Sequence, residues 1–82
     1  MMRETDRVPV RLSTVDEGAA VTVADIDAGR GAGLRLRELG LVRGVGGEVM
    51  YNGLHGAVVL RVKGMKLVLG RGMAGHVLVH LA

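Results

Sequence analysis

The clearest pattern in the chain is the alternation of hydrophobic and polar positions in the segments AVVLRVK and KLVL, which is typical of two half-buried β-strands. A two-residue turn at Gly64-Met65, with glycine first as a type II′ turn requires, predicts that the two strands form a hairpin. This register sets Val62 opposite Leu67 and Leu60 opposite Leu69. The predicted core face of the hairpin comprises Val58, Leu60, Val62, Leu67 and Leu69.

Four further segments have the alternation or composition of strands: VPVRL (8–12), AAVTVADID (19–27), GEVMYN (47–52) and HVLVHL (76–81). The first is expected at a sheet edge, because Pro9 has no N–H to donate to a ladder. In the third, the alternation places Val49 and Tyr51 on one face. The residues of the last segment that are expected to face the core are Val77, Val79 and Leu81.

Helical signals are short. A glycine-rich loop, residues 29–33, leads into one helix around Leu34–Leu39, which Gly40 ends. Ser13 is placed to cap one helical turn that ends at Gly18, and the segment RGMAG is expected to form a bend or a helical turn. Five to six short strands with one short α-helix predict a mainly β fold. A small closed β-barrel is expected, because closure removes exposed strand edges.

The composition allows one small domain. The chain has 82 residues, 49% of them hydrophobic, but it contains no Phe, Trp or Cys, and Tyr51 is its only aromatic residue. A valine-rich core without large rings suits a small, strongly curved sheet. We expect residues 1–7 to form a flexible tail and residues 8–82 to form the domain. Without cysteine, neither a disulfide nor a thiolate metal site can form.

The sequence shows no signal for export or for membrane insertion. Its first ten residues, MMRETDRVPV, mix both charge signs and lack the apolar stretch of a secretory signal. No apolar run approaches the roughly 18 residues of a membrane-spanning helix. We therefore expect a soluble, cytoplasmic protein without direct membrane insertion.

The charge of the chain does not predict a nucleic-acid partner. The sequence pI is about 10.2, but the net charge is only +3, because the acids are interleaved with the bases. Ordinary solubility explains a charge of this size. Arg35, Arg37 and Arg43 could contact phosphates, but base-binding surfaces also need several aromatic side chains for stacking. One tyrosine cannot supply them.

Motifs of nucleotide-binding and hydrolytic sites are incomplete. The glycines of GRGAG are spaced G-x-G-x-G rather than G-x-G-x-x-G, and no Gly-Lys pair is followed by a hydroxyl residue. Ser13 is the only serine, and a capping function suffices for it. Asp25 and Asp27 share a strand face, but solvated acids at a strand end explain them. We expect no enzyme.

The three histidines, His55, His76 and His80, are candidate ligands for a transition metal such as Fe2+ or Zn2+. His76 and His80 fall in one expected strand, about 13 Å apart. One ion with ligand bonds of about 2 Å cannot bridge that distance. Exposed histidines are the simpler interpretation and no cofactor is required, although a site shared between molecules stays open.

Several apolar residues fall in apparent loops: Val42, Leu54, Met65 and Met73. Within the predicted helix, Leu34 and Leu36 cannot both face the core, because positions i and i+2 diverge on a helix. Methionine side chains adapt well to partner surfaces. The pattern favours a docking module over an enzyme.

The order of these motifs resembles the FeoA family of small bacterial and archaeal ferrous-iron transport proteins. The resemblance spans residues 10–81 and rests on Leu-Ser near the start, Leu-x-x-Leu-Gly-Leu at the helix end, a hairpin, a Leu-x-Leu strand and an alanine-containing turn. The matching residues are Leu12, Ser13, Leu36, Leu39, Gly40, Leu41, Gly44, Gly56, Gly64, Leu67, Leu69, Ala74 and Val77. Arg43 and Ala57 stand where the family often has proline.

The resemblance implies an SH3-like barrel onto which Leu36, Leu39 and Leu41 anchor the helix. It also implies that Gly44 makes the turn into the following strand. On this interpretation the glycines of the opening loop permit a tight crossover and do not bind phosphate.

The resemblance also implies a function. FeoA-like proteins are non-catalytic accessory factors that dock on the cytosolic GTP-hydrolysing part of the FeoB ferrous-iron transporter, at the inner face of the membrane. We expect the docking residues to be Arg35, Arg37, Leu54, Met65 and Met73. The alternative is a metal-responsive regulatory barrel, like the C-terminal domain of iron-dependent repressors, that binds metal through its histidines. Either could form a homo-oligomer.

Overall fold

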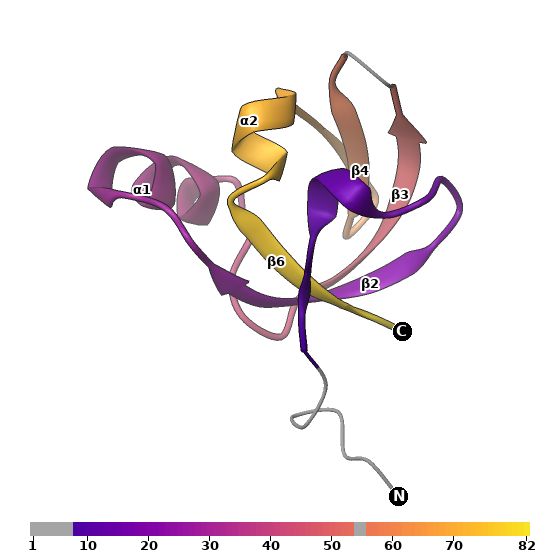
Figure 1. The fold of residues 1–82 in the computed structure, drawn as a ribbon, viewed down its shortest axis with the longest axis horizontal. Helices are drawn as coiled ribbons and strands as arrows, with labels where there is room; N and C mark the ends of the chain where they lie inside the picture. Colours follow the sequence, from indigo (N-terminus) through magenta and orange to yellow (C-terminus); the bar gives the residue numbers. More distant parts are fainter. Residues whose placement is uncertain (1–7, 54–55) are drawn as a thin grey trace, which may run out of the picture.

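The computed structural model describes residues 8–53 and 56–82, so the expected tail at residues 1–7 lies outside the described part (Figure 1). The prediction of a mainly β fold is confirmed. The elements in chain order are β1 (Val10–Arg11), the 3-10 helix η2 (Leu12–Thr14), β2 (Ala20–Ile26), α1 (Arg30–Glu38), β3 (Gly46–Asn52), β4 (Val58–Val62), β5 (Met65–Leu69), α2 (Arg71–Ala74) and β6 (Val77–Leu81).

All six strands belong to one antiparallel sheet with the order β1-β6-β2-β3-β4-β5. The sheet curves around the core, with β2 and β6 crossing below and β3 and β4 rising on one side (Figure 1). The expectation of a closed barrel is wrong, because β1 and β5 are the two edges of the sheet and do not pair with each other. β1 contains only two residues, too few to continue a ladder onto β5.

Side-chain hydrogen bonds link the segments that follow the two edge strands. The guanidinium group of Arg71, at the start of α2, donates to the carbonyl oxygen of Ser13 at 3.1 Å, to Asn52 Oδ1 at 2.6 Å and to the carbonyl oxygen of Gly53. Asn52 Nδ2 in turn donates to the carbonyl oxygens of Ser13 and Val15 at 3.0 and 2.8 Å. This polar cluster ties α2, η2 and the end of β3 together where strand pairing stops.

The hairpin of β4 and β5 forms with a different turn from the predicted one. Lys63 and Gly64 both have positive φ angles, 51° and 78°, which is the signature of a type I′ turn. Val62 therefore pairs with Met65, and Leu60 pairs with Leu67. The predicted register is wrong by two residues, but a shift of two returns every side chain to the same face. The residues predicted to face the core in β4 and β5 are therefore the ones that are buried.

A β-bulge in β3 overturns the expectation that Val49 and Tyr51 share a face. Val49 pairs with Leu60, but Tyr51 already pairs with Val59, so Met50 is an extra residue on the β3 side. The inserted residue reverses the alternation beyond it. Val49 is fully buried, whereas Tyr51 is 52% exposed.

Two local predictions, a cap at Ser13 and an inward-facing Leu81, are also wrong. Ser13 lies inside η2 and does not cap it; Arg11 holds the N-cap position, and no side chain makes a capping bond. Leu81 is 51% exposed, in contrast to the buried Val77 and Val79.

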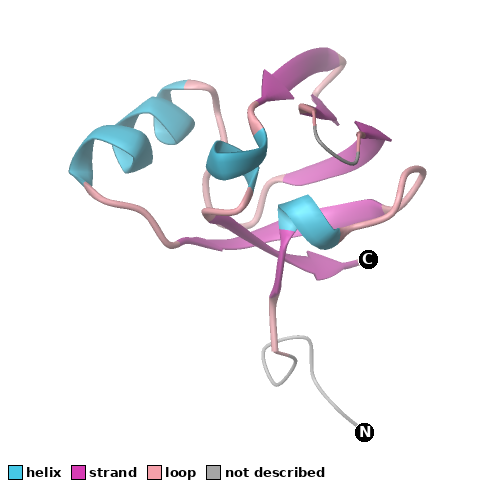
Figure 2. Cartoon of the chain, turned by 45° about the horizontal axis from the view of Figure 1, so that its top comes forward, coloured by secondary structure: helices cyan, strands magenta, loops and turns pink. Residues whose placement is uncertain are grey.

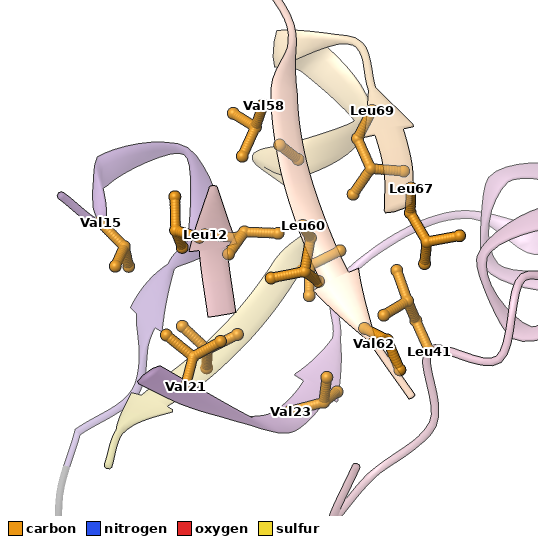
Figure 3. Packing of buried hydrophobic residues seen from close by; sticks show 14 of the residues in the cluster. Leu12, Val15, Val21, Val23, Leu41, Val58, Leu60, Val62, Leu67 and Leu69 are labelled. Carbon is orange, nitrogen blue, oxygen red and sulfur yellow. The ribbon is translucent and has the colours of Figure 1, made fainter. Parts of the chain in front are cut away.

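The core is built almost entirely from valine and leucine (Figure 3). α1 contributes one fully buried residue, Leu36, and the loop after it contributes Leu41, which points toward Val62 and Leu67. Leu39 is 43% exposed, so only Leu36 and Leu41 of the three expected anchors are in the core. Gly40 and Gly44 both have a φ of 92° and reverse the chain on either side of Leu41.

Candidate docking groove

A groove of about 560 Å³ lies between α1, the end of β2 and the loop that leads from α1 to β3. One wall is a single stripe of α1, formed by residues at positions i, i+3, i+4 and i+7, which share a helix face. These residues are Arg30, Gly33, Leu34 and Arg37. The rest of the lining comes from Asp25, Ile26, Ala28, Gly29, Leu41, Val42 and Arg43.

The groove exists because α1 is attached to the sheet through one side of the helix only. Leu36 is its single buried residue. Figures 1 and 2 show α1 projecting to one side of the sheet, apart from α2 and η2. The divergence of Leu34 and Leu36 predicted from their spacing is confirmed, since Leu36 is fully buried and Leu34 is 55% exposed.

The floor and lower walls of the groove are apolar. Leu34 faces it from α1, and Val42, 46% exposed, faces it from the following loop. The half-buried Ile26 and the fully buried Leu41 lie between them. An exposed apolar surface inside a concave site, rimmed by charge, is typical of a protein interaction site.

The charge on the rim is positive. Arg43 is held in place: its Nε donates to the carbonyl oxygen of Ala24 at 3.0 Å, and its guanidinium lies 3.8 Å from the carboxylate of Asp25. Arg30 and Arg37 form no ion pair or side-chain hydrogen bond with any described residue. Within residues 8–53 and 56–82, Arg30 and Arg37 are thus cations without a paired acid beside an apolar floor.

The five residues expected to dock a partner do not form one surface. Arg37 lines the groove, whereas Arg35 is exposed on α1 outside it. Met65 is 66% exposed at the beginning of β5, and Met73 is half-buried in α2 against the core. Leu54 lies outside the described residues.

Sequence reasoning missed most of the groove because it placed the start of the helix too late. A helix beginning at Arg30 puts Arg30, Leu34 and Arg37 on one face, and that spacing is visible in the sequence. The glycines at positions 31 and 33 concealed it, since glycine is a poor helix former. Val42 is visible in the sequence as an apolar loop residue, but its position in the groove depends on how the loop folds back.

The histidines lie in separate environments. His76 Nδ1 is 2.8 Å from the carbonyl oxygen of Asp27. His80 is half-buried, and its buried Nδ1 has no hydrogen-bond partner among the described residues; it lies near the exposed side chains of Val10 and Leu81. His55 lies outside the described residues. Over residues 8–53 and 56–82, no three His, Cys, Asp or Glu side chains gather around a point that could hold a metal ion. The described residues thus do not fit a metal bound within one chain.

The two strand-end acids pair with different arginines. Asp25 lies beside Arg43, and the carboxylate of Asp27 is 3.8 Å from the guanidinium of Arg11. All four side chains are more than half exposed, so each pair contributes little, about 0–1 kcal/mol, to stability.

The chain is a small β-domain with an open, SH3-like sheet and an exposed groove. Residues 10–81 match the family model described as the FeoA domain. The chain is also 38% identical over 68 residues to "Putative Fe(2+) transport protein A" of Methanocaldococcus jannaschii, an alignment that covers 83% of this chain and 82% of that protein. The chain belongs to the FeoA family, whose members are accessory proteins of Fe2+ transport.

Solved structures agree with this assignment. A crystal structure of an iron uptake regulatory protein (FeoA) superimposes with a TM-score of 0.83 at 28% identity, over 93% of this chain and 100% of that one. The FeoA protein of Chlorobium tepidum gives a TM-score of 0.78 at 30% identity, over 88% of this chain and 70% of that one.

The same fold occurs within longer proteins. IdeR of T. acidophilum superimposes with a TM-score of 0.82 over 93% of this chain, which corresponds to 35% of IdeR. The sequence identity is 16%, so this likeness shows the fold alone.

In the part of the chain that the structure describes, no helix has the length and apolar character needed to cross a bilayer.

Proposed function

We propose that this protein is a non-catalytic accessory factor that docks on the cytosolic GTP-hydrolysing part of the FeoB ferrous-iron transporter and supports or regulates it. On this proposal it acts in the cytoplasm, at the inner face of the membrane where its partner is held. The observation that carries the proposal is the groove beside α1, in a chain whose family serves Fe2+ transport.

The exposed apolar residues of the groove support docking because the fold does not need them. The core is complete without Leu34 and Val42, which are absent from the buried cluster. Burying such side chains against a partner releases water from apolar surface, and this is the main favourable contribution to association. The groove is thus available to a partner without any rearrangement of the sheet.

The metal-responsive alternative has weaker support. It depends on His55, His76 and His80, and the described residues do not gather a ligand group around either of the latter two. The similarity to repressors supports a shared fold only.

Calorimetric titration of the cytosolic part of the transporter, with and without a GTP analogue, tests the proposal. We expect saturable binding that weakens about tenfold or more when Leu34 and Val42 are both changed to serine, since central apolar contacts dominate interface energies. Val68→Ser is the matched control: Val68 is 70% exposed on β5, outside the groove, and its replacement should leave affinity unchanged. Absence of binding in both nucleotide states would refute the proposal.

A further inference from the structure

We infer that the groove binds an acidic, amphipathic helix of the partner, in which one apolar side chain lies between two carboxylates about 10 Å apart. The two carboxylates pair with Arg30 and Arg37, and the apolar side chain packs on Leu34 and Val42. The inference rests on the proposed function only for the identity of the protein that carries this helix.

The spacing of the carboxylates follows from the spacing of the arginines. Arg30 and Arg37 lie on the same face of α1, seven residues apart, and both line the groove. At a rise of about 1.5 Å per residue, they are about 10 Å apart along the helix axis. Leu34 lies between them. Two guanidinium groups at this distance match acidic residues seven positions apart on a second helix, and arginine binds carboxylates through two parallel hydrogen bonds.

The groove favours a helical occupant over an extended one. A bound extended segment needs a strand edge to satisfy its backbone groups. Along Asp25 and Ile26, one edge of β2 pairs with β6. Two further backbone groups are already bonded: the carbonyl oxygen of Ala24 accepts from Arg43, and the N–H of Ile26 donates to the carboxylate of Asp25. A helix satisfies its own backbone and needs only side-chain contacts from the groove.

Gly33 provides a second observation that the fold itself does not explain. A Cβ atom at this position would meet only the carbonyl oxygen of Ala28, at 3.9 Å, which is ordinary contact distance. Glycine inside a helix costs about 0.5–1 kcal/mol relative to alanine. Gly33 lies in the groove wall beside Leu34, where a bare backbone lets a second helix approach closely.

A second copy of this chain does not meet the charge requirement. α1 carries Arg30, Arg35 and Arg37 against a single acid, Glu38, and α2 carries Arg71 and no acid. Docking α1 of one copy in the groove of another would bring arginines together. Among the helices that the structure describes, none offers two acids at the required spacing, which favours a helix of a different protein as the occupant.

Single charge reversals on α1 provide matched variants. Arg37→Glu places repulsion in the groove, whereas Arg35→Glu makes the same change on the same helix outside it. Each should be titrated with the cytosolic part of the transporter and with a synthetic helical peptide that carries one leucine between two glutamates seven residues apart. A second peptide with lysines in place of the two glutamates is the control for the charge of the peptide. Amide NMR spectra of both variants verify that the fold is unchanged.

We expect Arg37→Glu to weaken binding of the transporter and of the acidic peptide by about tenfold or more. Arg35→Glu should change neither, and the lysine peptide should not bind. If the transporter binds, and Arg37→Glu and Arg35→Glu change its affinity equally or not at all, the inference is overturned and the proposed function stays in place. Acidic-peptide binding in the groove without transporter binding would support the inference and refute the proposed function. Equal binding of the two peptides would overturn the inference.

Discussion

The β4–β5 hairpin and α1 both carry leucines, but they place them differently. β4 and β5 bury Val58, Leu60, Val62, Leu67 and Leu69, and their polar residues face solvent. α1 buries Leu36 alone and leaves Leu34 on the groove wall. The hairpin is thus held by the core across its whole length, whereas α1 is held at one point. In this protein, the hairpin contributes mainly to the stability of the core, whereas α1 contributes mainly to the exposed wall of the groove.

The largest expected effect comes from shortening a leucine of the hairpin. Leu60→Ala removes a fully buried side chain and should lower the free energy of unfolding by about 2–5 kcal/mol. Leu34→Ala, the same change on α1, should alter it by less than about 0.5 kcal/mol, because the side chain is exposed. Urea denaturation measures both values. Similar losses for the two variants would abolish the contrast between hairpin and helix.

Gly47, in β3, has no room for a side chain, in contrast to the glycines of α1. A Cβ at Gly47 would lie 3.0 Å from the carbonyl oxygen of Arg61 and 3.2 Å from Leu60 Cδ1. Gly47→Ala should therefore destabilise the protein by about 1–3 kcal/mol through overpacking. Its neighbour supplies the control: Gly46 has only one contact, at 3.8 Å, and Gly46→Ala should cost less. Thermal unfolding of the two variants tests this, and equal Tm values would contradict it.

The smallest effect should have the opposite sign. A Cβ at Gly31 of α1 would meet no atom within 4 Å, so Gly31→Ala should stabilise the helix by about 0.5–1 kcal/mol. Hydrogen exchange of the α1 amides should slow while exchange in β4 stays unchanged. If exchange slows equally in both elements, α1 is not an independently held segment.

The sequence predicted the core better than the geometry that creates the groove. The alternation in β4 and β5 identified the inward residues correctly even though the turn was misplaced, because a two-residue slip preserves the face. The bulge at Met50 could not be predicted, since one inserted residue depends on contacts between β3 and β4. The groove depends similarly on the return of the loop containing Val42 toward the end of β2, which no local pattern encodes.

The pairing of β1 with β6 also determines how this domain can be joined to other polypeptides. Val10 lies opposite Val79, so the chain enters and leaves the domain at neighbouring strands, away from α1 (Figure 1). Domains whose ends lie close together at the surface can be fused or inserted into longer chains with little disturbance. The occurrence of this fold as about a third of T. acidophilum IdeR is consistent with such modular use. A polypeptide joined before β1 or after β6 would therefore start from the β1–β6 side of the sheet and not from α1.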